Sequence, residues 1–126
     1  NKFYFISPKE LELPRDFIQE LKDNSVLFEE LHSLEEALPH LDVLYMTRVQ
    51  KERFVNISDY EKVKDLFILK KEHLKNMKNT AIILHPLPKI NEIETAVDAD
   101  PRAAYFRQAQ NGLYMRMALL CYALEL

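Results

Sequence analysis

The sequence predicts an α/β protein in which a three-layer parallel sheet carries helices on both faces and ends in a long C-terminal helix. Short apolar runs rich in aromatic and β-branched residues alternate with segments of helical periodicity. Alternation at this spacing is typical of parallel sheets with crossover helices. At 126 residues the chain has the length of one domain, so we expect a single domain over residues 1–126.

We expect four strands, at about residues 2–6, 25–29, 42–46 and 80–84. Each is a short apolar run of the length typical of buried strands. The segments between them are long enough to cross over as helices, which favours parallel pairing.

The first two helices have recognisable start positions. Pro14 begins the first, and its Phe17 and Leu21 are expected to face inward. Ser33 precedes a short second helix and has Glu36 at the spacing of a capping box.

Three helical segments follow. Ser58 is expected to open one whose apolar stripe ends at Phe67, and residues 71–77 predict a further short turn of helix. Apolar residues at helical spacing then predict one long helix over 103–126. Nearly its whole circumference is apolar, whereas a surface helix needs only one apolar face. We therefore expect this helix to expose an apolar patch in the isolated chain or to bury it against another copy.

Composition excludes several classes of protein. A net charge of −3, with no block of lysine and arginine, disfavours a nucleic-acid surface. The single glycine, Gly112, excludes glycine-rich phosphate loops. The single cysteine, Cys121, permits no internal disulfide, favours a reducing compartment such as the cytoplasm, and is expected to lie in the core. No apolar run is long enough to predict a membrane span.

Two of the predicted strands end in unusual loops, at residues 47–53 and 85–88. Because the carboxyl ends of parallel strands meet at one edge of a sheet, we expect both loops to open there and to form a site. Arg48 suits a substrate carboxylate, and Gln50 adds an amide donor. The prolines of the second loop lack N–H groups, so this loop offers carbonyl oxygens to a substrate with N–H groups.

Simpler interpretations stay open on pattern alone. The 47–53 loop can be a solvated charged turn, and the 85–88 loop a structural turn that ends a strand. The four histidines have no metal-ligand spacing, so we expect no metal site and expect His85 to hydrogen-bond to the backbone.

The sequence of several segments resembles that of the C-terminal part of aspartate transcarbamylase. They are His85-Pro86-Leu87-Pro88-Lys89, Tyr105-Phe106-Arg107-Gln108 and Asn111-Gly112-Leu113, with the block that contains Arg48. The similarity covers essentially all 126 residues. It implies that this chain is the aspartate-binding half of such an enzyme, lacking the carbamoyl-phosphate half and inactive alone.

The resemblance also implies roles for particular residues. Arg48 and Gln50 correspond to residues that hold the side-chain carboxylate of aspartate, and Glu52 to the carboxylate that steadies that arginine. The backbone carbonyls of Pro86 and Leu87 correspond to those that contact the carbamoyl group and the incoming amine, and the bond from Leu87 to Pro88 to one that is cis. Further support is expected from Lys51, Pro88, Lys89 and Glu92, with Lys89 standing where the family usually has arginine.

The implied reaction is attack by the amine of L-aspartate on carbamoyl phosphate, which gives N-carbamoyl-L-aspartate and phosphate for pyrimidine synthesis. The resemblance implies no cofactor, a homotrimer, and a long helix packed on the carbamoyl-phosphate domain. Two alternatives remain: a non-catalytic scaffold or binding domain with the same fold, and a relative that uses ornithine. The positive charges of Arg48, Lys51 and Arg53 would repel ornithine.

Overall fold

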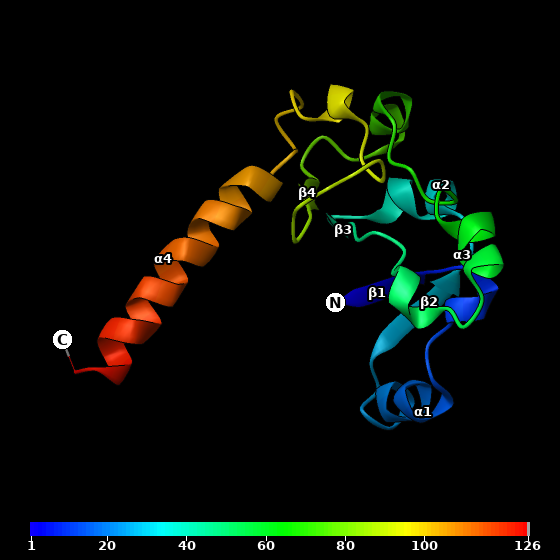
Figure 1. Ribbon diagram of the computed structural model, residues 1–126, viewed down its shortest axis with the longest axis horizontal. Helices are drawn as coiled ribbons and strands as arrows, with labels where there is room; N and C mark the ends of the chain where they lie inside the picture. The colour runs from blue at the N-terminus through cyan, green and yellow to red at the C-terminus, as the bar shows by residue number, and fades with distance from the viewer. Residues whose placement is uncertain (126) are drawn as a thin grey trace.

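The computed structural model describes residues 1–125 as an α/β fold from which one long helix projects (Figure 1). The strands are β1 (Lys2–Ile6), β2 (Leu27–Leu31), β3 (Val43–Tyr45) and β4 (Ile82–Leu84). The α-helices are α1 (Arg15–Asp23), α2 (Leu34–Ala37), α3 (Ile57–Val63) and α4 (Tyr105–Ala123). Short 3-10 turns connect them, namely η1 (Lys9–Leu11), η2 (Leu38–His40), η3 (Lys51–Arg53), η4 (Lys71–Asn76) and η5 (Thr95–Val97).

The strands pair in parallel, as the sequence predicted. β1 lies beside β2, and β3 lies beside β4, so the described residues form two two-stranded sheets. The second strand begins two residues later than predicted because the turn that ends α1 occupies the residues between the helix and the strand. Ser25 takes a left-handed φ of 53° and the N–H of Val26 bonds back to the carbonyl of Leu21, which ends the helix first.

The helix starts agree with the sequence at α1 and α2 and differ at α3. Pro14 directly precedes α1, and the Ser33 hydroxyl accepts a hydrogen bond from the N–H of Glu36. Helix α3, in contrast, begins at Ile57, so Asn56 and not Ser58 stands at its N-cap. The Asn56 side chain makes no capping bond to the helix backbone; its amide nitrogen instead lies 3.4 Å from a carboxylate oxygen of Asp59.

A core of apolar side chains lies between α2, β3, β4 and the turns that follow. Its largest fully buried members are Leu38, Leu69, Ile83, Ile93, Val97 and Tyr105. The prediction for α1 was partly wrong, because Phe17 is exposed while Leu21 is half-buried. Helix α1 therefore covers β2 only with part of its apolar stripe.

Helix α4 leaves this core almost at once. Only Tyr105, its first residue, is buried, and the helix then runs away from the rest of the molecule (Figure 1). Its start is two residues later than predicted, and the predicted last residue, Leu126, lies outside the described residues. Cys121 was expected in the core and is exposed instead, because no segment within residues 1–125 packs on that part of α4.

Candidate functional site

Strands β3 and β4 bring the two unusual loops together. Tyr45 pairs with Leu84 at the carboxyl ends of the strands, and the N–H of Met46 continues the ladder to the carbonyl of Leu84 at 2.9 Å. The loop after Tyr45 and the loop after Leu84 therefore start side by side at one edge of the sheet. This juxtaposition was predicted from the sequence and is confirmed.

The first loop presents its polar side chains to solvent. An Arg48 nitrogen lies 3.9 Å from a Glu52 oxygen, and both side chains are more than half exposed. The Nε of Arg53 donates to the Oε1 of Gln50 at 2.6 Å, which leaves the amide N–H₂ of Gln50 directed elsewhere. Lys51 begins η3 and is exposed. Exposed arginine and amide donors at this edge can bind a carboxylate.

The second loop is bent by its backbone geometry. The peptide bond between Leu87 and Pro88 is cis, as the resemblance implied, and Leu87 has a φ of 51°. Leucine rarely adopts a left-handed φ, so the surrounding structure must hold it there. The N–H of Leu87 donates to the Nδ1 of His85 at 2.8 Å, which confirms that His85 hydrogen-bonds to the backbone.

A buried acid stands behind this loop. The Oε1 of Glu92 lies 2.7 Å from the Nε2 of His85, and its Oε2 accepts the N–H groups of Ile90 and Asn91, each at 3.1 Å. Burial acts to raise the pKa of Glu92, but hydrogen bonds from backbone N–H groups and from His85 outweigh it, so the pKa lies below its usual value. Glu92 is thus a buried carboxylate that joins the 85–88 loop to the 90–92 turn.

Gln108 links the starts of the two loops. Its Oε1 accepts the N–H of His85 at 3.0 Å, and its Nε2 lies 3.3 Å from the hydroxyl oxygen of Tyr45. Gln108 belongs to one of the segments that carry the resemblance, but the sequence alone assigns it no role. Only the fold reveals the role, because Gln108 is on α4 and its partners lie at the carboxyl ends of β3 and β4.

Lys89 supports the far end of the second loop. Its ammonium lies 3.2 Å from a carboxylate oxygen of Asp98 and donates to the carbonyl of Ile93 at 3.2 Å. The Tyr105 hydroxyl donates to the same carboxylate, and burial, followed by this hydrogen bond, raises the pKa of Tyr105. Lys89 therefore ties the loop to Ile93 and to Asp98 at the end of η5, and Asp98 in turn accepts from Tyr105 at the start of α4.

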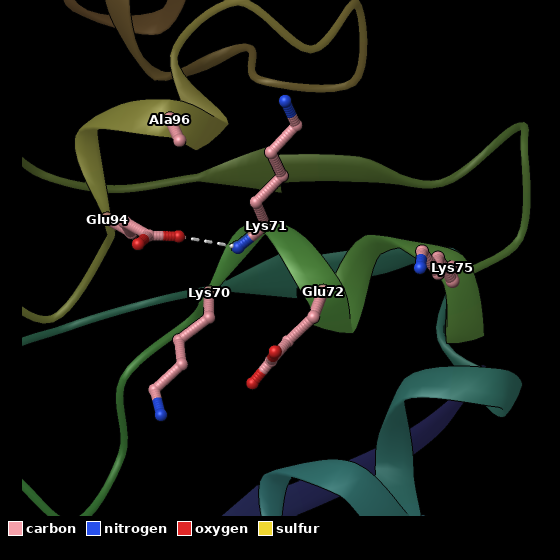
Figure 2. A pocket seen from close by; sticks show the side chains of 6 residues that line it. All are labelled: Lys70, Lys71, Glu72, Lys75, Glu94 and Ala96. Atoms are coloured by element: carbon pink, nitrogen blue, oxygen red, sulfur yellow. Dashed lines mark hydrogen bonds between the residues drawn. The ribbon is translucent and has the colours of Figure 1, made fainter.

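One hollow of the described surface lies away from these two loops. It has a volume of about 420 Å³ and is lined by Lys70, Lys71, Glu72, Lys75, Glu94 and Ala96. Figure 2 shows that the three lysine side chains point in different directions, and that Glu94 is held by the backbone N–H of Lys71. Because these charges do not converge, this hollow is not a built anion site, and it contains no predicted site residue.

Residues 1–125 offer neither a metal centre nor a membrane span. No cluster of histidine, cysteine, aspartate or glutamate in this range has the geometry of a metal centre. No helix in the same range is long and apolar enough to cross a membrane.

The chain is similar to known carbamoyltransferases over nearly its whole length. The family model described as the Asp/Orn binding domain of aspartate/ornithine carbamoyltransferase matches residues 1–123. The aspartate carbamoyltransferase catalytic subunit of Lachnoclostridium phytofermentans is 50% identical over 125 residues, which is 98% of this chain and 41% of the relative. The chain spans about two fifths of the length of the curated relatives it matches.

Solved structures support the same relation. The catalytic subunit of aspartate transcarbamoylase from M. jannaschii is 45% identical, covers 98% of this chain and 41% of its own, and has a TM-score of 0.87. Aspartate transcarbamoylase from Trypanosoma cruzi, solved with carbamoyl phosphate and aspartate, is 36% identical over 94% of this chain and 40% of its own, with a TM-score of 0.83. From its sequence and its fold, this chain belongs to the aspartate/ornithine carbamoyltransferase family and matches that family's Asp/Orn binding domain.

Proposed function

We propose that this chain is the aspartate-binding part of an aspartate carbamoyltransferase. The observation that carries the proposal is the pairing of β3 with β4, which sets the Arg48 loop beside the bent Leu87 loop. In this proposal Arg48 and Gln50 bind the side-chain carboxylate of L-aspartate, and Glu52 and Lys51 support them. The carbonyls of Pro86 and Leu87 receive the carbamoyl N–H groups and the amine, while Pro88, Lys89 and Glu92 hold the loop.

In this proposal the enzyme accelerates the reaction by orienting the two substrates and stabilising charge, and it forms no covalent intermediate with either of them. The amine of L-aspartate attacks the carbonyl carbon of carbamoyl phosphate, phosphate leaves, and N-carbamoyl-L-aspartate forms. Carbonyl oxygens orient the nucleophile and the carbamoyl group, which removes much of the entropic cost of bringing two substrates together. The similarity to an enzyme solved with both carbamoyl phosphate and aspartate supports this pair of substrates.

Larger features of the enzyme belong to the same proposal. We infer a three-layer parallel sheet with helices on both faces for this domain, a carbamoyl-phosphate domain on which α4 packs, and a homotrimer in the cytoplasm. The exposed apolar residues of α4 support a packing partner for this helix. The complete enzyme, and not residues 1–126 alone, would carry out the transfer.

Two alternatives make different predictions. The family description includes ornithine as well as aspartate. The exposed positive charges of Arg48, Lys51 and Arg53 favour a dicarboxylate over a cationic amine. A scaffold that kept the fold without the binding role would respond to neither amino acid.

The first test measures binding and transfer with matched variants. We expect L-aspartate to shift the amide NMR signals of Arg48, Gln50 and Leu87, and L-ornithine to leave them in place. Arg48→Ala should weaken this response by about 10- to 100-fold, since a hydrogen bond to a charged group is worth about 1.5–3 kcal/mol. Arg15→Ala removes an exposed arginine from α1 and should change nothing.

A transfer assay completes the test. N-carbamoyl-L-aspartate that forms with the purified protein and disappears in Arg48→Ala would show that a carbamoyl-phosphate half accompanies this chain. An absence of any response to L-aspartate in the unmodified chain would contradict the proposal and favour the scaffold.

A further inference from the structure

Glu92 and His85 form a pair that is almost completely buried, with side chains 4% and 2% exposed. The Oε1 of Glu92 and the Nε2 of His85 lie 2.7 Å apart, and within residues 1–125 neither atom has another polar partner. A buried carboxylate without a partner is costly, so this contact offsets part of the cost of burying Glu92.

The other polar atoms of the pair, Oε2 of Glu92 and Nδ1 of His85, form hydrogen bonds with the backbone. The Oε2 of Glu92 accepts two backbone N–H groups, from Ile90 and Asn91. The Nδ1 of His85 accepts the N–H of Leu87 and therefore carries no proton. A neutral imidazole has its single proton on one nitrogen, so here the proton lies on Nε2 and faces the carboxylate.

This arrangement stabilises the backbone conformation of Leu87. Its φ of 51° is unfavourable for leucine, and its N–H has the His85 ring as its partner. If the ring carried its proton on Nδ1, two N–H groups would face each other and the bond to Leu87 would be lost.

We propose that Glu92 is a positioning residue that acts through His85: it fixes the Nε2–H tautomer, and the free Nδ1 then holds Leu87 in its left-handed conformation. This inference rests on the proposed function, because it assigns Glu92 to the loop whose carbonyls receive the substrate. Glu92 does not touch the substrate, and its effect reaches the site along one chain of contacts from carboxylate to ring to backbone.

The isosteric change Glu92→Gln tests whether the carboxylate sets the tautomer of His85, because it removes one acceptor oxygen and hardly changes the size of the side chain. A glutamine has one acceptor oxygen and one N–H₂ group, so it cannot accept from the backbone N–H groups and from His85 with separate oxygens. With its oxygen toward Ile90 and Asn91, its N–H₂ faces Nε2 and favours the opposite tautomer. The bond from Leu87 to Nδ1 is then lost although size and shape hardly change.

The first experiment needs no variant and no ligand. The ring ¹⁵N chemical shifts of His85 in the unmodified chain near pH 7 report which nitrogen carries the proton. We expect the Nε2–H tautomer, with a Leu87 amide that exchanges slowly. An Nδ1–H tautomer, or a freely exchanging Leu87 amide, would overturn the proposal.

The second experiment separates the two sides of the ring. His85→Asn places an amide oxygen near the position of Nδ1 and can still accept from Leu87, whereas His85→Gln reaches toward Glu92 and leaves Leu87 without its partner. Among variants whose amide spectra show an intact fold, we expect His85→Asn to keep L-aspartate affinity within about threefold. His85→Gln and Glu92→Gln should each lower the affinity about tenfold, because small displacements of positioning groups are costly.

Glu72→Gln is the matched control, since it makes the same chemical change on an exposed glutamate of η4. It should leave both the His85 tautomer and the affinity unchanged. If His85→Gln binds L-aspartate as well as His85→Asn does, Leu87 does not depend on the ring and the inference is wrong. The proposed function fails separately, through a lack of L-aspartate response in a chain whose His85 tautomer is as expected.

Discussion

Lys89 illustrates how one residue can replace another without copying its geometry. The resemblance to transcarbamylases placed an arginine at this position, and lysine lacks the planar fork that binds a carboxylate through two parallel bonds. In this chain the ammonium instead reaches one oxygen of Asp98 and the carbonyl of Ile93. Those two partners lie in different directions, which suits a point charge, so Lys89 serves as a tie within the loop.

Asp100 and Arg102 provide a prediction about acid stability. The Nε and Nη2 of Arg102 donate to the two oxygens of Asp100 at 2.8 and 2.9 Å. These side-chain hydrogen bonds, which outweigh burial, lower the pKa of Asp100 below its usual 3.8. The stabilisation is complete above the unfolded pKa and is lost as the pH falls through the lower folded value.

Asp100→Asn should therefore flatten the decrease in the free energy of unfolding below about pH 4. Urea unfolding at a series of pH values measures this slope. Asp16→Asn, an exposed change on α1, serves as the control and should keep the original slope. A slope in Asp100→Asn equal to that of the unmodified chain would show that this carboxylate does not contribute.

At the scale of elements, local patterns predicted the strands well because they depend on runs of apolar residues. The parallel pairing of β3 with β4, and hence the meeting of the two loops, followed from the rule that governs strand ends. Contacts between distant segments were not predictable in the same way. The hydrogen bond from the N–H of His85 to the Oε1 of Gln108 joins the end of β4 to α4, and the two residues are 23 positions apart in the sequence. A local sequence pattern cannot predict a contact between residues so far apart.

The failures have a common physical origin. Cys121 was expected in the core because its helix is apolar, but an apolar pattern reports only what a helix can bury. Whether burial occurs depends on a neighbouring surface, and the described part of the chain supplies none along most of α4. The same reason explains the exposure of Phe17 on α1.

Gly112 gives a prediction about α4 itself. It lies within the helix, and an added Cβ would meet only a side-chain nitrogen of Arg116 at 3.5 Å, which is ordinary contact. Alanine is more favourable than glycine in a helix by about 1 kcal/mol. Gly112→Ala should therefore raise the helical circular dichroism and slow amide exchange in the middle of α4 by about three- to fivefold.

Ala109→Gly on the same helix should have the opposite effect of similar size. If Gly112→Ala instead speeds exchange in α4, the glycine would be required by a contact that the isolated helix does not show.

For the molecule as a whole, the exposed surface of α4 dominates the expected behaviour. Leu113, Met117, Leu120 and Leu124 follow one another at helical spacing, and each is at least half exposed. Their neighbours Tyr114, Met115 and Leu119 are exposed as well, so the helix offers apolar surface around most of its circumference. Removal of such surface from water is favourable by about 25 cal/mol per Å² of area buried, and soluble monomers rarely leave a patch of this kind open.

We therefore expect the isolated chain to associate through α4, with an average mass in sedimentation equilibrium that rises over the micromolar range. A double change, Leu113→Glu with Leu120→Glu, should restore the monomer because association would then bury two carboxylates without partners. Val55→Glu is the control, since it adds a charge at a fully exposed apolar residue away from α4. Equal dissociation by the control would point to net charge as the cause, and a monomer at every concentration would mean that α4 needs the specific shape of a second domain. In that case the apolar surface of this helix is adapted to one partner, and its exposure alone does not drive self-association.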